Sequence, residues 1–496
     1  MYFPELPVRW GLIFWCTLSL SVLSAQTLRR HPANPRYLEY QGKPILLIGG
    51  GEHYGAVLNL DFDYRRYLNT LEAEGIKLTR LFTGSYVEKP GAFGIQHNTL
   101  APAPGKFICP WARSTTSGYV NGGNQFDLER WDEAYFQRMK DFMNLAAQKG
   151  VIVELVFFSS LYGDDGWRFS PLHPDNNINL EQAVDRFKVH TLDNGPLLKY
   201  QEQLVRKLVR ELNAFDNLYY EIQNEPWADL TDSVGIVMPS LSPTDFKIPG
   251  FFFKNRIDLA KPASLEWQAK IAAIVRDEET GLPKKHLIAQ NYCNHGFPLA
   301  VVDTNVDIIN FHYVIPEAAA LNYGHERPVS CDETGFFGSN TEVYRKQLWH
   351  FALSGGAIWN HLDYSFFVGK ENGTGINQAP GAGSTLLRSQ FRFLREFMES
   401  FCLPEMAPMD WLAANTTGAR ARVMGCAYGE YAVYLTGGRG CNLRMYLPRG
   451  EYKVKWIDPV NGQLLKQEIR SHNGGLTDWP YDEFDGEAAV AVRRDQ

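Results

Sequence analysis

Eight short apolar runs, rich in β-branched and aromatic residues, recur along the chain. They cover residues 45–50, 77–82, 151–158, 217–223, 286–292, 306–313, 328–333 and 356–362. Several segments between them have the apolar spacing of amphipathic helices, as at Leu128, Trp131, Tyr135 and Met139. Continuous apolar strands are typical of parallel sheets, which must be covered by helices on both faces. The pattern predicts an α/β fold, a closed (β/α)8 or TIM barrel within residues 26–402.

Beyond Pro404 the pattern changes to short strands separated by Gly and Asn turns, and no helical period remains. Residues 403–496 are therefore predicted to form a small all-β, sandwich-like domain that packs against the barrel. Tyr452, Trp456 and Trp479 could bind polysaccharide there. A purely structural domain is the preferred interpretation.

Residues 1–25 have the features of a secretory signal peptide. Arg9 precedes the apolar run WGLIFWCTLSLSVLSA, which ends at Ala25 and is short for a membrane span. An uncleaved anchor is the alternative. We expect a secreted or periplasmic protein with no further attachment to a membrane.

The cysteines fit an oxidising compartment without requiring disulfides. Loss of Cys16 with the signal would leave six of the seven cysteines, an even number. Cys426 and Cys441 are the favoured pair, whereas Cys331 is interpreted as a buried free thiol.

The charge of the chain argues against one class of partner. A formal net charge of -7 and the lack of a basic cluster make nucleic acid an unlikely ligand. Acidic substrates are not favoured either, and nothing in the sequence indicates an oligomeric state.

The fourth predicted strand ends in Asn224, Glu225 and Pro226. Polar residues at the carboxyl end of a barrel strand face the cleft. Proline has no N–H to donate, so strand pairing stops where Glu225 is presented. The alternative is a surface acid beside a turn proline.

A second acidic site favours the catalytic interpretation of Glu225 over a surface acid. Asp332 and Glu333 end the seventh predicted strand before a glycine turn. Retaining glycoside hydrolysis needs two carboxyl groups facing each other, one to protonate the leaving oxygen and one to attack the anomeric carbon. Glu225 and Glu333 are the predicted pair.

At these two sites the sequence resembles the clan A glycoside hydrolases, which are cellulase-like barrels, over roughly residues 36–402. The resemblance implies that Glu225 is the acid/base and Glu333 the nucleophile of a retaining enzyme acting on a β-linked poly- or oligosaccharide. It implies no metal and no organic cofactor, since two carboxyl groups of different pKa suffice. The Glu333 carboxylate is expected to raise the pKa of Glu225.

The resemblance extends to other strand ends. It implies that Arg80 holds the nucleophile, that Asn224 binds the sugar 2-hydroxyl and that Trp359 is a platform for the sugar ring. His312 and Tyr313, at the end of strand six, are candidates near the nucleophile. Further candidate substrate contacts are Glu52, His53, Tyr54, Trp227, Asn291, Asn294 and His295.

Three long inserts, 84–127, 159–194 and 228–262, follow strands two, three and four and should wall the cleft. Their aromatic residues are Tyr86, Trp111, Tyr119, Phe126, Trp167, Trp227 and Phe251, Phe252 and Phe253. The sugar, the linkage and the choice between endo and exo attack are left open.

Two other functions are weighed. A non-catalytic carbohydrate-binding barrel would keep the aromatic cleft but lack one acid, and both acids are present. A metal-dependent barrel hydrolase would need ligands such as His53, His312 and His361 to converge on one ion.

Overall fold

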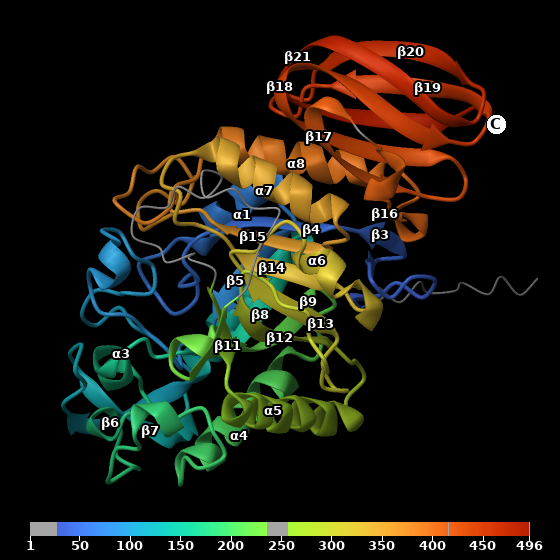
Figure 1. Cartoon of the computed structure of the whole chain (residues 1–496). Helices are drawn as coiled ribbons and strands as arrows, with labels where there is room; N and C mark the ends of the chain where they lie inside the picture. The colour runs from blue at the N-terminus through green and yellow to red at the C-terminus, as the bar shows by residue number, and fades with distance from the viewer. Residues whose placement is uncertain (1–26, 236–255, 415, 496) are drawn as a thin grey trace, which may run out of the picture.

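The computed structural model describes residues 27–235, 256–414 and 416–495. Eight parallel strands close into a barrel (Figure 1). In barrel order they are β4 (Leu47–Gly51), β5 (Leu78–Phe82), β8 (Ile152–Ser159), β9 (Leu218–Asn224), β12 (Leu287–Asn294), β13 (Ile308–His312), β14 (Val329–Glu333) and β15 (Ile358–Leu362). Pairing of β12 with β9 and of β15 with β4 completes the ring. The predicted barrel is confirmed, with strand bounds that differ by at most two residues.

Helices cover the outside of the barrel. They are α1 (Tyr64–Glu74), α2 (Glu133–Gln148), α4 (Leu197–Leu212), α5 (Pro262–Thr280), α6 (Ala318–Leu321), α7 (Thr341–Leu353) and α8 (Thr385–Glu399). The sequence of α2 explains its position. The Asp132 side chain caps its first turn by accepting from the N–H groups of Ala134 and Tyr135, and its Met139 and Phe142 are fully buried against the strands.

The predicted inserts lie at the carboxyl ends of the strands and contain their own elements. The first holds the hairpin β6 (Trp111–Ser117) and β7 (Asn124–Trp131), and the second holds the short helix α3 (Asp164–Phe169). The third holds β10 (Thr231–Gly235) and β11 (Arg256–Ala260), an antiparallel pair that joins the edge of β12. A small sheet of β1 (Arg29–Arg30), β2 (Leu38–Tyr40) and β3 (Lys43–Ile45) precedes the barrel.

The C-terminal strands form one antiparallel sheet that folds over its own core. They are β16 (Ala407–Pro408), β17 (Thr417–Gly425), β18 (Glu430–Leu447), β19 (Gly450–Ile457), β20 (Leu464–His472) and β21 (Gly475–Arg494). Tyr452, Trp456 and Trp479 lie inside that core with at most 1% of their surface exposed. They are therefore packing residues, and the suggestion that they bind polysaccharide is wrong.

The β domain shares a second apolar cluster with the barrel. The ring of Trp349 on α7 stacks on Tyr434 of β18, with centroids 4.9 Å apart. A buried ion pair joins Arg345 of α7 to Glu487 of β21, and the Tyr434 hydroxyl donates to the same carboxylate at 2.7 Å. The two domains thus meet through a packed seam over α7 (Figure 1).

The six cysteines among the described residues are free thiols. The favoured pairing of Cys426 with Cys441 is wrong, because Cys426 packs in the cluster shared with the barrel and Cys441 in the core of the β domain. Cys331 is a buried free thiol, as predicted.

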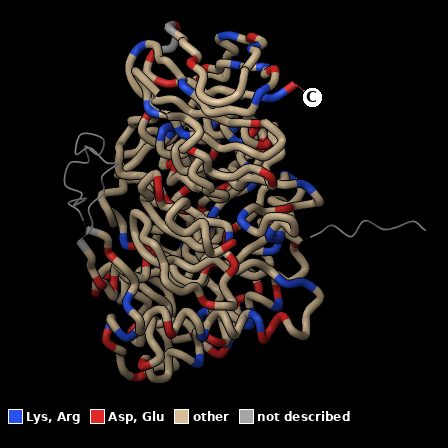
Figure 2. The backbone as a smooth tube through the Cα atoms, turned by 45° about the vertical axis from the view of Figure 1, so that its right-hand side comes forward, with Lys and Arg blue, Asp and Glu red and all other residues tan. Residues whose placement is uncertain are grey.

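Residues of both charge signs occur on both domains. Lys and Arg are interspersed with Asp and Glu along the described chain (Figure 2). No helix in the described ranges is long and apolar enough to cross a bilayer. The predicted signal peptide, 1–25, and the aromatic run 251–253 lie outside the described residues.

Candidate active site

A pocket opens at the carboxyl ends of the barrel strands, and both predicted catalytic acids line it. Its other lining residues come from strand ends and from the first two inserts. They are His53, Tyr54, Phe82, Tyr86, Glu88, Phe93, Leu100, Ser159, Tyr162, Asn224, Tyr313, Phe336, Leu362 and Tyr364.

Glu225 is presented by the turn that its neighbouring proline enforces. Strand β9 ends at Asn224, and Pro226 begins a 3-10 helix that runs from Pro226–Ala228. Oε2 of Glu225 accepts from the Tyr162 hydroxyl at 2.8 Å, and Oε1 lies 2.9 Å from Nδ1 of His312. The side chain is 11% exposed, so one edge reaches the pocket.

Glu333 ends β14, and both of its carboxylate oxygens accept hydrogen bonds. Oε2 accepts from the Tyr54 hydroxyl at 2.8 Å and from Nη1 of Arg80 at 3.2 Å, and Oε1 accepts from the Tyr313 hydroxyl. These donors fix the carboxylate on the pocket floor. An oxygen of Glu225 and an oxygen of Glu333 lie within 4.8 Å of each other.

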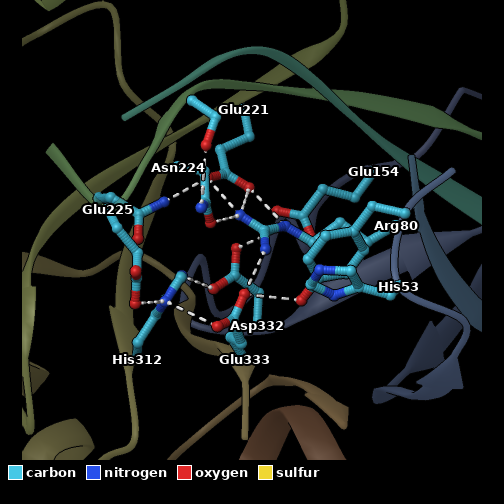
Figure 3. Close-up of polar contacts among 12 residues, drawn as sticks. His53, Arg80, Glu154, Glu221, Asn224, Glu225, His312, Asp332 and Glu333 are labelled. Carbon is cyan, nitrogen blue, oxygen red and sulfur yellow. Dashed lines mark hydrogen bonds and ion pairs between the residues drawn. The ribbon is translucent and has the colours of Figure 1, made fainter. Parts of the chain in front are cut away.

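Arg80 is the centre of a buried charge cluster beneath the pocket (Figure 3). Its guanidinium binds Glu221 through Nε at 2.8 Å and Nη2 at 2.6 Å, and Nη2 also donates to Oδ1 of Asn224 at 2.8 Å. Nε lies 3.3 Å from Asp332. Arg80 therefore positions Asn224 and Glu333 at the pocket, as predicted for Glu333, and it neutralises acids in the barrel interior.

His312 ends β13 between two acids. Its Nδ1 faces Glu225 and its Nε2 lies 2.9 Å from Oδ1 of Asp332. Burial alone would lower the pKa of His312, but Asp332 and Glu333 outweigh it and raise that pKa to about 10. The imidazole is therefore a cation at neutral pH.

That cation reverses one electrostatic expectation. Burial would raise the pKa of Glu225, but the hydrogen bond and charge of His312 outweigh burial and hold that pKa below its ordinary value. The sequence predicted a raised pKa from the Glu333 carboxylate alone. The difference arises because the imidazolium lies only 2.9 Å from Glu225, and the sequence does not show that the two groups are in contact.

Glu154 is an acid of a different kind within the same cluster. It lies in β8, fully buried, 3.8 Å from Nε of Arg80. Burial, followed by the nearby Asp332 carboxylate, raises the pKa of Glu154 well above its ordinary value. Glu154 is therefore harder to ionise than an exposed glutamate.

Backbone strain is concentrated around this pocket. In the described chain nine non-glycine residues have positive φ. Six of them line the pocket: Tyr54, Phe93, Tyr162, Glu225, Tyr313 and Phe336. Each left-handed residue costs about 1–3 kcal/mol and persists only where its surroundings impose it, which is typical of functional sites.

Trp359 does not face the pocket, so its predicted role as a sugar platform is wrong. Side chains alternate along β15, and the turn of the strand places Leu362 at the pocket. Trp359 instead packs between the barrel and α7, with its ring centroid 5.7 Å from that of Phe351. The aromatic ring that the last barrel strand contributes is Tyr364, two residues beyond its end.

Some predicted contacts lie behind the pocket wall. Asn291 donates to Glu221 in the barrel interior, and the Trp227 ring packs edge-on against His312 at 5.2 Å. Neither residue lines the pocket, so both are supporting residues and not direct contacts.

Three other candidates are also structural. Glu52 accepts from the N–H groups of Gly55 and Ala56 at 2.9 and 3.1 Å. Asn294 accepts from the N–H of Asp258, and His295 Nδ1 lies 2.9 Å from the carbonyl of Tyr313. His53, Tyr54 and Asn224 do line the pocket.

Sequence reasoning missed Glu88, Tyr162 and the role of Tyr364. Glu88 and Tyr162 belong to the irregular inserts, where no periodic pattern indicates direction. Only their place after strands two and three, at the predicted cleft, was available as a signal.

The proposed metal ligands do not converge. His53 binds Glu88 at 3.3 Å, His312 lies between two acids, and His361 packs outside the barrel against Tyr344 and Phe391. Two other sets of three groups, Glu221, His312 and Asp332, and Glu225, His312 and Glu333, are close enough to share an ion. Arg80 and the imidazolium already supply positive charge to these carboxyl groups, so the donors do not form a vacant ligand set.

Comparison with known proteins gives a structural match only. No protein-family model and no curated protein matches the sequence. Among solved structures, one titled glycoside hydrolase is 15% identical, with a TM-score of 0.59 over 95% of this chain and 97% of that one. A glycoside hydrolase family 5 protein from Bacteroides vulgatus is 14% identical, with a TM-score of 0.59 over 94% and 93%. The chain therefore shares the fold of these glycoside hydrolase structures.

Proposed function

We propose that the protein is a secreted or periplasmic retaining glycoside hydrolase. It cleaves β-glycosidic bonds of a poly- or oligosaccharide, with Glu225 as acid/base and Glu333 as nucleophile. The observation that supports this most directly is the separation of less than 4.8 Å between carboxylate oxygens of the two residues. Retaining enzymes have carboxyl groups about 5–5.5 Å apart, whereas inverting enzymes need about 6.5–9.5 Å to admit a water molecule.

The surroundings of each acid support its role. Glu333 accepts hydrogen bonds from Tyr54, Tyr313 and Arg80, which orient an oxygen for attack on the anomeric carbon. Glu225 has one edge in the pocket, where its carboxyl group can reach a leaving oxygen. The match to glycoside hydrolase structures supports the same reaction class.

The reaction proceeds in two displacements. Glu225 gives a proton to the leaving oxygen while Glu333 forms a bond to the anomeric carbon, and the aglycon departs. Glu225, now a base, removes a proton from water, whose oxygen displaces Glu333 and restores the starting configuration. A non-catalytic barrel is disfavoured because both acids share one pocket.

Chemical rescue tests the two roles separately. Glu225→Ala should still form the glycosyl-enzyme from dinitrophenyl glycosides, because a good leaving group needs no proton, while natural linkages become very slow. Added azide should restore turnover and give a β-glycosyl azide. Glu333→Gly should instead use azide or formate in the vacated space and give an inverted product.

A matched control is Glu279→Gln, a buried acid that binds His286 at the amino end of β12. It should keep activity and show no azide effect. Full activity of either catalytic variant on a natural substrate would overturn the proposal, as would equal losses in two folded variants that azide cannot rescue.

A further inference from the structure

We infer that the pocket is blind on its glycon side, so that the enzyme removes one sugar at a time from the non-reducing end, and that Glu88 with His53 recognises hydroxyls of that sugar. The inference rests on the proposed function. The acid/base lies on the leaving-group side, so the aglycon passes Glu225 and Tyr162. In Figure 3 His53 lies on the opposite side of the charge cluster from Glu225.

The rim is closed on the His53 side by contacts between two loops. The insert after β5 meets the loop after β15, where the N–H of Gln96 donates to the carbonyl of Gln378 at 2.8 Å. The N–H of His97 donates to Oδ1 of Asn377 at 3.0 Å, and Nδ2 of Asn377 donates back to the His97 carbonyl at 2.8 Å. The His97 ring stacks on Phe367 with centroids 4.4 Å apart.

The same insert is also fixed to the insert after β8. The ring of Phe93 packs edge-on against Tyr162 at 5.1 Å, and Lys89 forms an ion pair with Asp165. The contacts of Gln96 and His97 with the loop after β15 thus wall the pocket on the His53 side, and those of Phe93 and Lys89 fix the same insert in place. A chain extended beyond the bound sugar on the His53 side would meet these described loops.

Glu88 and His53 provide the polar groups at the blind end. Glu88 is 3% exposed and its carboxylate binds Nε2 of His53 at 3.3 Å, the Tyr86 hydroxyl at 3.2 Å and Nδ2 of Asn98 at 2.5 Å. The Nδ1 atom of His53 is buried and has no hydrogen-bond partner among the described residues. A carboxylate beside an imidazole offers acceptor and donor sites to adjacent sugar hydroxyls.

The first test is the product pattern of the wild-type enzyme on oligosaccharides labelled at the reducing end. We expect labelled chains that shorten by one sugar at a time, and at least a 100-fold loss of rate when the non-reducing end carries a 4,6-O-acetal. Internal fragments, or full turnover of the blocked chain, would overturn the inference. The azide rescue of Glu225→Ala would be unaffected by either result, so the two proposals fail separately.

The second test pairs a variant with deoxy substrates. The wild type should discriminate against 3-deoxy or 4-deoxy aryl glycosides by at least 100-fold in kcat/KM, and Glu88→Gln should reduce that discrimination at least tenfold. An unchanged ratio in a variant with wild-type melting would exclude Glu88 as the recognition group.

A rim variant, His97→Ala with Asn377→Ala, should gain turnover of the blocked chain. Failure of that gain in a folded protein would contradict the blind wall.

Discussion

His312 places Nδ1 2.9 Å from Oε1 of Glu225 and is itself a cation, because neighbouring carboxylates raise its pKa to about 10. The acid that must donate a proton thus lies against a positive charge that favours its ionised form. Without a bound substrate, this contact confines a protonated Glu225 to acidic pH.

The pH profile should report that contact. In kcat/KM, activity falls as pH rises through the pKa of Glu225, because the general acid loses its proton. His312→Gln removes the charge, so the pKa of Glu225 should rise and the basic limb should move up by about 1–2 pH units. Profiles on an aryl glycoside and on a natural substrate would measure it.

His361→Gln is the control for that experiment. His361 is a buried histidine outside the barrel whose Nδ1 lies 3.0 Å from the Thr334 hydroxyl. Its replacement should leave the basic limb in place. A shift of the same size in both variants would contradict the assignment.

Arg80→Lys should keep a buried positive charge but lose the fork that binds Glu221, Asn224 and Glu333 together. Misplacing the nucleophile by about 1 Å costs about 100-fold in kcat. Arg80→Leu should instead lose stability by about 3–5 kcal/mol, since it leaves buried carboxylates unpaired. Comparing kcat per folded molecule with the melting temperature separates the two effects. Equal activity in Arg80→Lys and wild type would contradict a positioning role.

Tyr54→Phe removes one of the hydroxyl groups that hold Glu333. We expect the glycosylation step to slow about 10- to 100-fold, because the nucleophile loses an orienting donor. Tyr37→Phe is the matched control, since its buried hydroxyl donates to the Met406 carbonyl far from the pocket. Burst kinetics with a dinitrophenyl glycoside would measure the step. A slower deglycosylation alone would contradict this role.

His190 should contribute to acid unfolding. Burial lowers the pKa of His190 to about 3, whereas the unfolded chain binds that proton near pH 6.5. Between these values the unfolded state holds more protons, so the free energy of unfolding falls as pH falls, by about 1.4 kcal/mol per pH unit at most. His190→Phe, between the rings of Phe158 and Trp267, should flatten that dependence. Urea unfolding at pH 7 and pH 5 would check it, and an unchanged slope would contradict it.

The eight strands and both acids were predictable because each depends on a local signal. Apolar runs marked the strands, and Pro226 marked the end of β9 where Glu225 is presented. Trp359 was misplaced because side chains alternate along β15, and only the structure shows that Leu362, on the opposite face from Trp359, is the residue that lines the pocket.

The rest of the site depends on contacts between irregular segments far apart in sequence. His97 and Asn377 are separated by 280 positions and meet only because β5 and β15 both flank β4. Insert residues such as Glu88 and Tyr162 have no period that indicates their direction. The cysteine pairing failed for a related reason, since nothing local shows that Cys426 and Cys441 belong to different cores.

The seam between the barrel and the β domain limits how the two domains can be recombined. Trp349 and Arg345 of α7 are complementary to Tyr434 and Glu487 of the β domain. A barrel expressed without that domain would expose the Trp349 ring to water and leave the Arg345 guanidinium without its carboxylate partner. Chimaeras that exchange the C-terminal domain should therefore keep the residues at Arg345 and Trp349 matched to those that the incoming domain presents.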